Sequence, residues 1–389
     1  MDGHALALST MGTPAGVSVR LNPFKPTASP LPILEGAERV PWSPYGYVLT
    51  QRPVFTLHPL FHAGAYYVQD SSAMFVGELL RRCLEPGPLR VLDLCAAPGG
   101  KTTDAAASLR ECCGDGFLLV ANEVMRARAA VLADNLARWG DPNVVLTSVD
   151  PQAFGRLGGY FDIVIADVPC SGEGMFRKDP RAVEEWSPEL VELCAARQRR
   201  ILADAWPCLR EGGVLIYSTC TFEDAENDAN LEWAAQTLGG EIIPPFEAPS
   251  CVRRTRCGHL LVPGEVPGEG QWAGALRKTA PQAVGRKADL SVLRPVRQGL
   301  RKGELKGKDF VPDADYALSI LFDRKDYNCV DVDRQTALHF LHRDVLTLPQ
   351  AAPGYNAVSY LGHPLGFVKN IGSRCNNLLP KDRRILMNV

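Results

Sequence analysis

Five short segments rich in valine, isoleucine and leucine, between residues 90 and 220, most limit what this chain can fold into. They are RVLDLC (90–95), FLLVANE (117–123), NVVLTSVD (143–150), FDIVIAD (161–167) and GVLIYSTC (213–220). Apolar and polar residues do not alternate along them, as they would along a strand with one wet face. These segments therefore predict strands that are buried on both faces of a sheet.

Helical patterns separate the predicted strands. Apolar residues recur at helical spacing in KTTDAAASL (101–109), in MRARAAVLADNLARWG (125–140) and from Pro188 to Leu209. Strands that alternate with helices predict a parallel sheet covered on both sides, which is a doubly wound α/β domain. The segment QWAGALRK (271–278) predicts one more strand, and the domain is expected to end near residue 279.

The two ends of the chain predict smaller units. Before residue 70 the sequence is rich in proline, and YGYVLT (45–50) and PVFTLH (53–58) predict a small α+β module that contains strands. Near the other end, the pair NAVSY (356–360) and LGFVK (365–369) around LGHP predicts a hairpin in a compact domain. We therefore expect an N-terminal module (1–70), an α/β domain (71–279), a basic linker (280–308) and a C-terminal domain (309–389).

The composition excludes several classes of protein. Hydrophobic residues make up 46% and charged residues 22%, as in soluble globular proteins rather than disordered ones. No stretch approaches the run of about 18 apolar residues that a membrane helix needs, and the start lacks the features of a signal peptide. We therefore expect a cytoplasmic protein with no membrane partner. Twelve cysteines without a C-x-x-C pair predict neither a disulfide framework nor a zinc site.

The net charge of −2 hides a basic run between residues 277 and 308. Ten lysines and arginines occur there against Asp289 and Glu304, a local excess of +8. Such a run is either a linker kept soluble by its charge or a contact for the phosphates of a nucleic acid. By itself it favours the linker, and it gains weight only beside other evidence.

The loop after the first predicted strand is the first place to look for a ligand, because open parallel sheets bind ligands outside the carboxyl ends of their strands. It reads Asp93-Leu94-Cys95-Ala96-Ala97-Pro98-Gly99-Gly100-Lys101-Thr102. Small residues and paired glycines let the backbone approach a ligand, and the following helix presents free N–H groups. Cys95 stands where a Walker A loop needs glycine, and the dinucleotide fingerprint G-x-G-x-x-G is absent.

Three carboxylates end the next predicted strands at the same edge of the sheet. Glu123 ends the second strand, Asp150 the third and Asp167 the fourth. A carboxylate after the second strand is the usual partner of ribose hydroxyls, because it can accept a hydrogen bond from each. Each residue alone could be an ordinary cap. Together with the glycine loop, they favour a ligand that contains adenosine.

Two cysteines follow neighbouring strands of the predicted sheet. Cys170 lies in VPCSGEG after the fourth strand, and Cys220 lies in STCTF after the fifth. Adjacent parallel strands end side by side, so both cysteines should face the ligand crevice. Most other cysteines, including Cys194 and Cys208, are expected to be small buried apolar residues.

Thiol chemistry at such a crevice suits the methylation of carbon 5 of cytosine. That carbon becomes nucleophilic only after another nucleophile adds at carbon 6, and a thiolate both adds and leaves readily. The adduct also needs an acid or hydrogen-bond donor at the ring nitrogen, and later a route for the proton on carbon 5. One cysteine and one carboxylate could suffice, and a second cysteine can assist the release.

The chain resembles the Nol/Nop/Sun family of RNA cytosine-5 methyltransferases, in particular the bacterial branch that acts on small-subunit ribosomal RNA. The two cysteine motifs together are the most specific part of this resemblance, which covers nearly the whole chain. The other similar segments are VSVRLNPFKP (17–26), YYVQDSSAM (66–74), LDLCAAPGGKT (92–102), GEGQWAGALRK (268–278) and GHPLGFVKNIGSRCNN (362–377).

The resemblance implies a Rossmann-like class I methyltransferase core that uses S-adenosylmethionine, and a C-terminal PUA-like domain that binds RNA. Glu123 would then bind the ribose, Asp150 the adenine side and Asp167 the crevice between cofactor and base. The loop around the methionine part of the cofactor would consist of Cys95, Ala96, Ala97, Pro98, Gly99, Gly100 and Lys101.

The resemblance also gives the two cysteines different roles. Cys220 would be the nucleophile, and Cys170 would assist release of the product, with Asp167 as the third catalytic residue. DNA cytosine methyltransferases instead use the cysteine that follows the proline, so the presence of both cysteines assigns the RNA branch. No metal is implied, and no oligomer.

Two positions depart from the family pattern. Val168 stands where the family usually has alanine, a tolerable change next to the cofactor. Little precedes VSVRLNPFKP (17–26), where relatives usually carry a further helical segment, so the completeness of the N-terminal RNA-binding module stays open.

Two other functions are compatible with parts of this pattern. A transfer-RNA cytosine methyltransferase would share the motifs of the α/β domain, and only the C-terminal domain favours ribosomal RNA. A non-catalytic RNA-binding assembly factor could have kept the fold. The intact Cys170, Cys220, Asp167 and glycine loop count against it.

Overall fold

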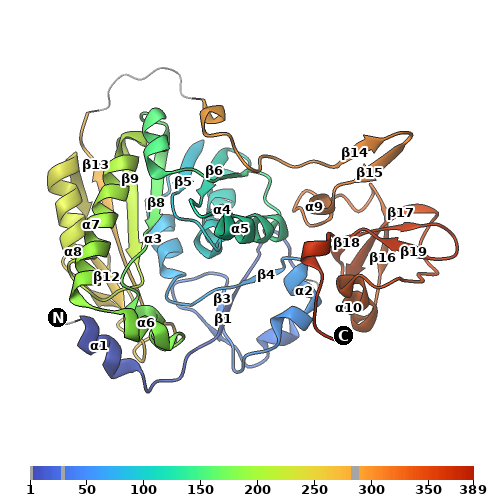
Figure 1. Cartoon of the computed structure of the whole chain (residues 1–389), viewed down its shortest axis with the longest axis horizontal. Helices are drawn as coiled ribbons and strands as arrows, with labels where there is room; N and C mark the ends of the chain where they lie inside the picture. Colours follow the sequence, from blue (N-terminus) through green and yellow to red (C-terminus); the bar gives the residue numbers. More distant parts are fainter. Residues whose placement is uncertain (1–2, 28–30, 282–288) are drawn as a thin grey trace.

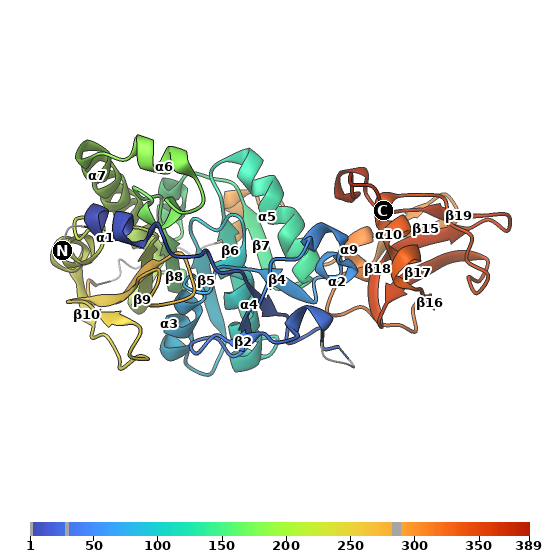
Figure 2. The same cartoon turned by 90° about the horizontal axis from the view of Figure 1, so that it is seen from below.

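A mixed sheet of nine strands forms the centre of the chain, which the computed structural model describes over residues 3–27, 31–281 and 289–389. Its five parallel strands lie in the order β9-β8-β5-β6-β7 and match the five predicted segments (Figures 1 and 2). Their bounds are β5 (Leu89–Asp93), β6 (Phe117–Asn122), β7 (Val144–Thr147), β8 (Phe161–Asp167) and β9 (Leu209–Thr219). The predicted doubly wound core is confirmed.

Antiparallel strands extend the sheet beyond β9. The predicted sixth strand is β13 (Gln271–Lys278), which pairs antiparallel with β9 along its length. The sheet continues through β12 (Gly258–Leu261) and β11 (Arg253–Arg254), while β10 (Gly240–Ile243) pairs with the other end of β13.

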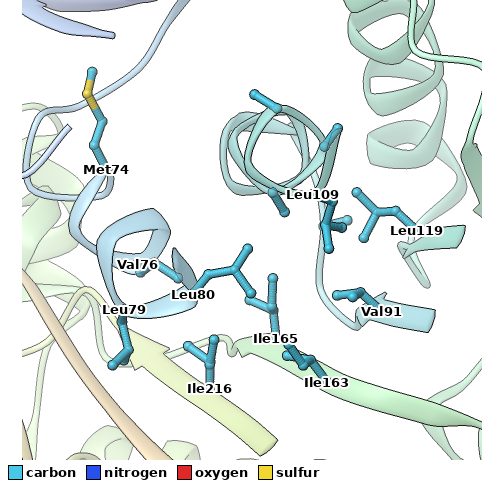
Figure 3. Close-up of a cluster of buried hydrophobic side chains, with 14 of the residues drawn as sticks. Met74, Val76, Leu79, Leu80, Val91, Leu109, Leu119, Ile163, Ile165 and Ile216 are labelled. Carbon is cyan, nitrogen blue, oxygen red and sulfur yellow. The ribbon is translucent and has the colours of Figure 1, made fainter. Parts of the chain in front are cut away.

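Successive residues of the parallel strands point to opposite faces, and helices bury both faces. On one face, Val91, Ile163 and Ile165 pack with apolar residues of three helices. Figure 3 shows these strand residues near Leu80 and Leu109, which belong to two of the helices. On the other face, Leu92 and Val164 pack against two further helices. The helices of the first face are α3 (Phe75–Cys83), α4 (Gly100–Cys113) and α5 (Arg126–Trp139), and those of the second are α7 (Pro188–Ala205) and α8 (Asp228–Ala234).

The N-terminal region forms its own four-stranded sheet in the order β2-β3-β1-β4. The predicted segment YGYVLT contains β3, whereas PVFTLH contributes no strand and folds into the 3-10 helix Phe55–Leu57. Pro53 begins this segment and Pro59 follows it, and neither proline has a backbone N–H to donate to a neighbouring strand. The elements are α1 (Gly3–Thr10), β1 (Ser18–Leu21), β2 (Glu38–Arg39), β3 (Gly46–Val48), α2 (Pro59–His62) and β4 (Tyr66–Val68).

The segment predicted to be a basic linker is more structured than a linker. Leu290 and Leu293 are buried, and the backbone of Val296 and Arg297 bonds to Leu146 at the edge of β7. The segment thereby covers an edge strand that would otherwise be open to pairing. Its last residues form β14 (Gly303–Lys306), which makes a hairpin with β15 (Asp309–Pro312). Residues 282–288 lie outside the described residues.

The C-terminal region contains a second four-stranded sheet, in the order β16-β17-β18-β19. Its centre is the antiparallel pair of β17 and β18, which confirms the predicted hairpin around Leu361 and Gly362. The elements are α9 (Ala314–Ala317), β16 (Asn328–Asp331), α10 (Arg334–His342), β17 (Gly354–Tyr360), β18 (His363–Asn370) and β19 (Cys375–Asn377).

The C-terminal region lies against α2 and α5 in both views (Figures 1 and 2). Arg383 reaches Asp134 on α5 at 2.6 Å and Asp315 at 2.7 Å, and its side chain is mostly buried. The backbone N–H of Ile320 donates to the carbonyl oxygen of Gly140, the residue that follows α5. The region is therefore attached by polar contacts to the domain that carries the ligand edge.

In the part of the chain that the structure describes, no helix has both the length and the apolar character needed to cross a bilayer.

Candidate active site

The loop between β5 and α4 is fixed at the carboxyl edge of the sheet by its backbone. The N–H of Leu94 donates to Ile165 in β8, and the N–H of Ala96 donates to Asn122 in β6. Gly99 turns the chain into α4 with a φ of 112°, a backbone conformation that residues with a Cβ rarely adopt. The glycine at this position is therefore required by the path of the loop.

This loop forms one wall of a cavity of about 180 Å³. The walls contain most of the predicted cofactor loop, namely Cys95, Ala96, Ala97, Pro98, Gly100 and Lys101, together with Asp167. The facing wall consists of Tyr67, Val68, Gln69, Asp70 and Ala73. No site residue was predicted in that second wall, although the family-like segment YYVQDSSAM (66–74) contains all of it.

Arg20 in β1 ties the two walls together. It is fully buried and donates to the side chain of Gln69 at 2.8 Å, to the carbonyl oxygen of Gly100 at 3.1 Å and to Thr103 at 2.6 Å. Its guanidinium carbon also lies over the ring of Trp139, 4.7 Å from the ring centroid. The N-terminal sheet therefore supports the glycine loop directly.

Glu123 and Asp150 lie beyond the walls of this cavity and differ strongly from each other. Glu123 is 3% exposed, and its Oε1 accepts the backbone N–H of Met125 at 2.9 Å. Its Oε2 lies 3.2 Å from Arg128 without hydrogen-bond geometry. Asp150 is exposed and caps the 3-10 helix Pro151–Arg156 through the N–H of Gln152. Glu123 is therefore a buried hydrogen-bond acceptor at the carboxyl edge of the sheet, whereas Asp150 lies on the surface.

A further carboxyl group, Asp93, ends β5 beneath the glycine loop. It is fully buried, and its Oδ2 accepts the hydroxyl of Thr102 at 2.6 Å. Burial raises the pKa of Asp93 to about 7. No role was predicted for Asp93 from the sequence.

Asp167 lies at the centre of the polar contacts in the site. Its Oδ2 accepts from the ammonium of Lys101 at 2.8 Å, and its Oδ1 accepts from Ser218 at 2.7 Å and Gln271 at 3.2 Å. Burial disfavours the charge on Lys101, but the charge and hydrogen bond of Asp167, together with Cys220 and Asp93, outweigh it, so the pKa of Lys101 is raised. Lys101 therefore carries a positive charge at the crevice.

The two predicted catalytic cysteines are in contact. Cys170 follows β8 and Cys220 follows β9, and their sulfur atoms lie 3.1 Å apart. The backbone N–H of Gly174 also donates to the carbonyl oxygen of Cys220 at 2.8 Å. The prediction that adjacent parallel strands bring these cysteines together is confirmed.

The environments of the two sulfurs are unequal. The hydrogen bond with Cys220, burial and the charge of Glu226 hold the pKa of Cys170 well above the usual thiol range. Cys220 instead interacts with the positive charge of Lys101. A protonated Cys170 can therefore donate a hydrogen bond to the Cys220 sulfur.

Among residues 3–27, 31–281 and 289–389, no group of three or more histidine, cysteine, aspartate or glutamate side chains could hold a metal ion.

Three family models match successive parts of the chain. The model described as 16S rRNA methyltransferase RsmB/F matches residues 83–250. The model of the N-terminal domain of 16S rRNA methyltransferase RsmF matches residues 5–71, and that of the methyltransferase RsmF PUA domain matches residues 327–385.

Known proteins resemble the chain over most of its length. Ribosomal RNA small subunit methyltransferase F of Escherichia coli O139:H28 is 32% identical over 82% of this chain and 78% of the relative. The solved structure of a methyltransferase homolog protein from Pyrococcus horikoshii is 27% identical and has a TM-score of 0.58, covering 70% of this chain and 90% of its own.

A third protein shows the fold alone. It is NSun6 from Pyrococcus horikoshii, solved with SFG, with a TM-score of 0.58 and 19% identity over 71% of this chain and 94% of its own. The extent of the match to the methyltransferase F relatives, together with the three family models, shows that the chain belongs to the RsmB/F family of 16S rRNA methyltransferases.

Proposed function

We propose that the protein is an S-adenosylmethionine-dependent RNA cytosine-5 methyltransferase that acts on small-subunit ribosomal RNA through a covalent adduct with Cys220. The observation that carries the proposal is the 3.1 Å contact between the Cys170 and Cys220 sulfurs beside the Lys101–Asp167 ion pair. The names of the relatives favour ribosomal over transfer RNA as the substrate.

The residues at the carboxyl edge fit S-adenosylmethionine. The cavity is lined by the glycine loop and by residues 67–70. At the same edge, beyond these walls, the buried Glu123 Oε2 lies 3.2 Å from Arg128 and has no hydrogen-bond partner. Such an acceptor suits the hydroxyl groups of the ligand. A fold neighbour was solved with SFG, an analogue of S-adenosylmethionine, which also supports this ligand.

In this proposal the cofactor supplies an electrophilic methyl group on a sulfonium. The glycine loop from Cys95 to Lys101 and the segment Tyr67–Asp70 hold it, Glu123 binds the ribose, and Asp150 lies on the adenine side. The surface position of Asp150 limits it to the outer part of the ligand.

The protein groups then act on the cytosine ring. The Cys220 thiolate adds to carbon 6, and the ring electrons move to carbon 5, which becomes the nucleophile for the methyl group. Asp167, held by Lys101 and Ser218, accepts a hydrogen bond from the amino group of the base or from its protonated ring nitrogen. The base reaches this crevice only outside its stack, so the target is unpaired or flipped out.

Bisulfite sequencing of ribosomal and transfer RNA from cells with and without the protein tests the proposal. We expect one or a few cytosines of small-subunit ribosomal RNA to lose protection when the protein is absent, and to regain it with wild-type protein but not with Cys220→Ala. Loss of protection only in transfer RNA would move the substrate to the alternative class. Unchanged protection in both RNAs would contradict cytosine-5 methylation.

A further inference from the structure

The segment that carries Cys170 is held from both sides by buried polar groups. The amide of Gln198 in α7 donates to the carbonyl oxygen of Pro169 at 3.0 Å. Glu226 accepts the backbone N–H of Ser171 at 3.1 Å and also the hydroxyl of Ser171. The Gln198 amide donates to Glu226 as well, at 2.6 Å, so one pair of side chains holds both neighbours of Cys170.

This pair lies in the interior, where such groups cost free energy unless they are satisfied. Glu226 and Gln198 are both 0% exposed. Burial raises the pKa of Glu226 to about 7, against hydrogen bonds from Ser171 and Gln198 that lower it. Apolar residues of similar volume often stabilise an interior better than a buried carboxyl group does. The burial of this polar pair therefore indicates that its hydrogen bonds serve to fix the backbone around Cys170.

The same contacts connect the Cys170 segment to the Cys220 loop. The hydroxyl of Ser171 lies 3.0 Å from that of Thr221, the residue after Cys220. Glu226 itself follows Cys220 by six residues, and its carbonyl oxygen accepts the hydroxyl of Tyr217 in β9. The distance between the two sulfurs is thus set by a network in which Glu226 contacts both loops.

We propose that Glu226, together with Gln198, is a positioning residue that keeps the Cys170 sulfur against the Cys220 sulfur during release of the methylated base. This inference rests on the proposed function. In the release step, the proton on carbon 5 leaves to water, and its electron pair re-forms the double bond between carbons 5 and 6. The bond from carbon 6 to sulfur breaks, and its electron pair returns to Cys220. The Cys170 thiol donates a hydrogen bond to that departing thiolate, which requires the two sulfurs to stay in contact.

The first test compares Glu226→Gln with Asp228→Asn as a matched control. Asp228 is another buried carboxylate of the same segment, but it accepts from Thr255 and Cys257 and not from the Cys170 segment. With substrate RNA, Glu226→Gln should slow release about tenfold relative to methyl transfer, the scale set by loss of a buried hydrogen bond. The adduct should therefore accumulate on denaturing gels, whereas Asp228→Asn should release product as the wild type does.

The second test needs no RNA. Diamide removes one hydrogen from each of two thiols and leaves a disulfide, and peptide mapping by mass spectrometry follows the Cys170–Cys220 product. In the wild type this disulfide should form fast because the sulfurs are already in contact. It should form about tenfold more slowly in Glu226→Gln, and at the wild-type rate in Asp228→Asn. Gln198→Leu is measured alongside, so that a failure of Glu226→Gln to fold does not end the test.

The two tests separate the possible outcomes. Slower disulfide formation and slower release together support the inference. If disulfide formation is slower but release is normal, Glu226 positions Cys170 but this positioning does not matter for release. If release is slower but disulfide formation is normal, Glu226 does not act by positioning Cys170. Either result overturns the inference. A wild-type protein that forms no adduct and transfers no methyl group contradicts the proposed function instead.

Discussion

The ammonium of Lys101, in the glycine loop, lies 2.8 Å from the carboxylate of Asp167 at the end of β8. The two residues are 66 positions apart in the chain and meet because β5 and β8 are neighbouring parallel strands. This ion pair joins the glycine loop, which lines the cavity, to the end of β8, from which the Cys170 segment continues. It also provides the positive charge that interacts with Cys220.

Replacing Lys101 should therefore affect chemistry more than folding. Lys101→Met removes the positive charge that interacts with Cys220 and leaves Asp167 without its cation. We expect methyl transfer to fall by about 10² or more, the usual range for a lost group of this kind. Single-turnover transfer of a labelled methyl group measures this rate. The control is Lys178→Met, which removes a half-exposed cation that contacts Asp70 and Glu269. Equal losses in the two variants would contradict a specific role for Lys101.

Glu123 should contribute directly to cofactor affinity. Its buried Oε2 lies 3.2 Å from Arg128 and has no hydrogen-bond partner, and under the proposed function it accepts a ribose hydroxyl. Glu123→Ala should weaken S-adenosylmethionine binding by about 1–3 kcal/mol, the cost of losing hydrogen bonds to a charged acceptor. Calorimetry measures the affinity, with the exposed Glu241→Ala on β10 as control. An affinity equal to that of the control would remove Glu123 from the site.

Asp93 predicts a pH dependence of stability. Burial raises its pKa to about 7 from the ordinary aspartate value of 3.8, so between these pH values the folded chain holds a proton that the unfolded chain has lost. Its contribution to stability is fully present below about pH 4 and is lost as the pH rises towards 7. Asp93→Asn cannot ionise, so its melting temperature relative to the wild type should rise between pH 5 and pH 8. A constant difference between the two proteins would mean that Asp93 does not titrate in this range.

Much of this architecture was predictable from local sequence. The five parallel strands are apolar on both faces, and such runs have few alternatives to a buried sheet. Once β8 and β9 are adjacent, Cys170 and Cys220 must end side by side. The hairpin of β17 and β18 was also predictable, because turn residues separate two apolar runs there.

Contacts between distant segments were not predictable in this way. The donation from Arg20 in β1 to Gly100 joins residues 80 positions apart and depends on the packing of two sheets. The contact of Glu226 with Ser171 joins residues 55 positions apart, in loops that follow two different strands. The bonds of Val296 and Arg297 to Leu146 likewise follow from an edge strand that needs a cover, which the charge of that segment does not indicate.

The basic segment should contribute to RNA binding through phosphates. Arg301 and Lys308 are exposed near the hairpin of β14 and β15, and each phosphate contact adds about one unit to the slope of log affinity against log salt. Arg301→Ala with Lys308→Ala should therefore reduce this slope by up to about 2. The matched control is Arg197→Ala with Arg200→Ala on the exposed face of α7. If both double variants change the slope equally, the effect reflects only the net charge.

The most direct measurement of the central claim is the covalent adduct formed by single-cysteine variants with substrate RNA. The account predicts that Cys220→Ala forms no adduct and transfers no methyl group, because the ring is never activated. Cys170→Ala should still attack and methylate but release slowly, so an adduct resistant to denaturing electrophoresis should accumulate. An adduct that accumulates with Cys220→Ala and never with Cys170→Ala would contradict the assignment of Cys220 as the nucleophile.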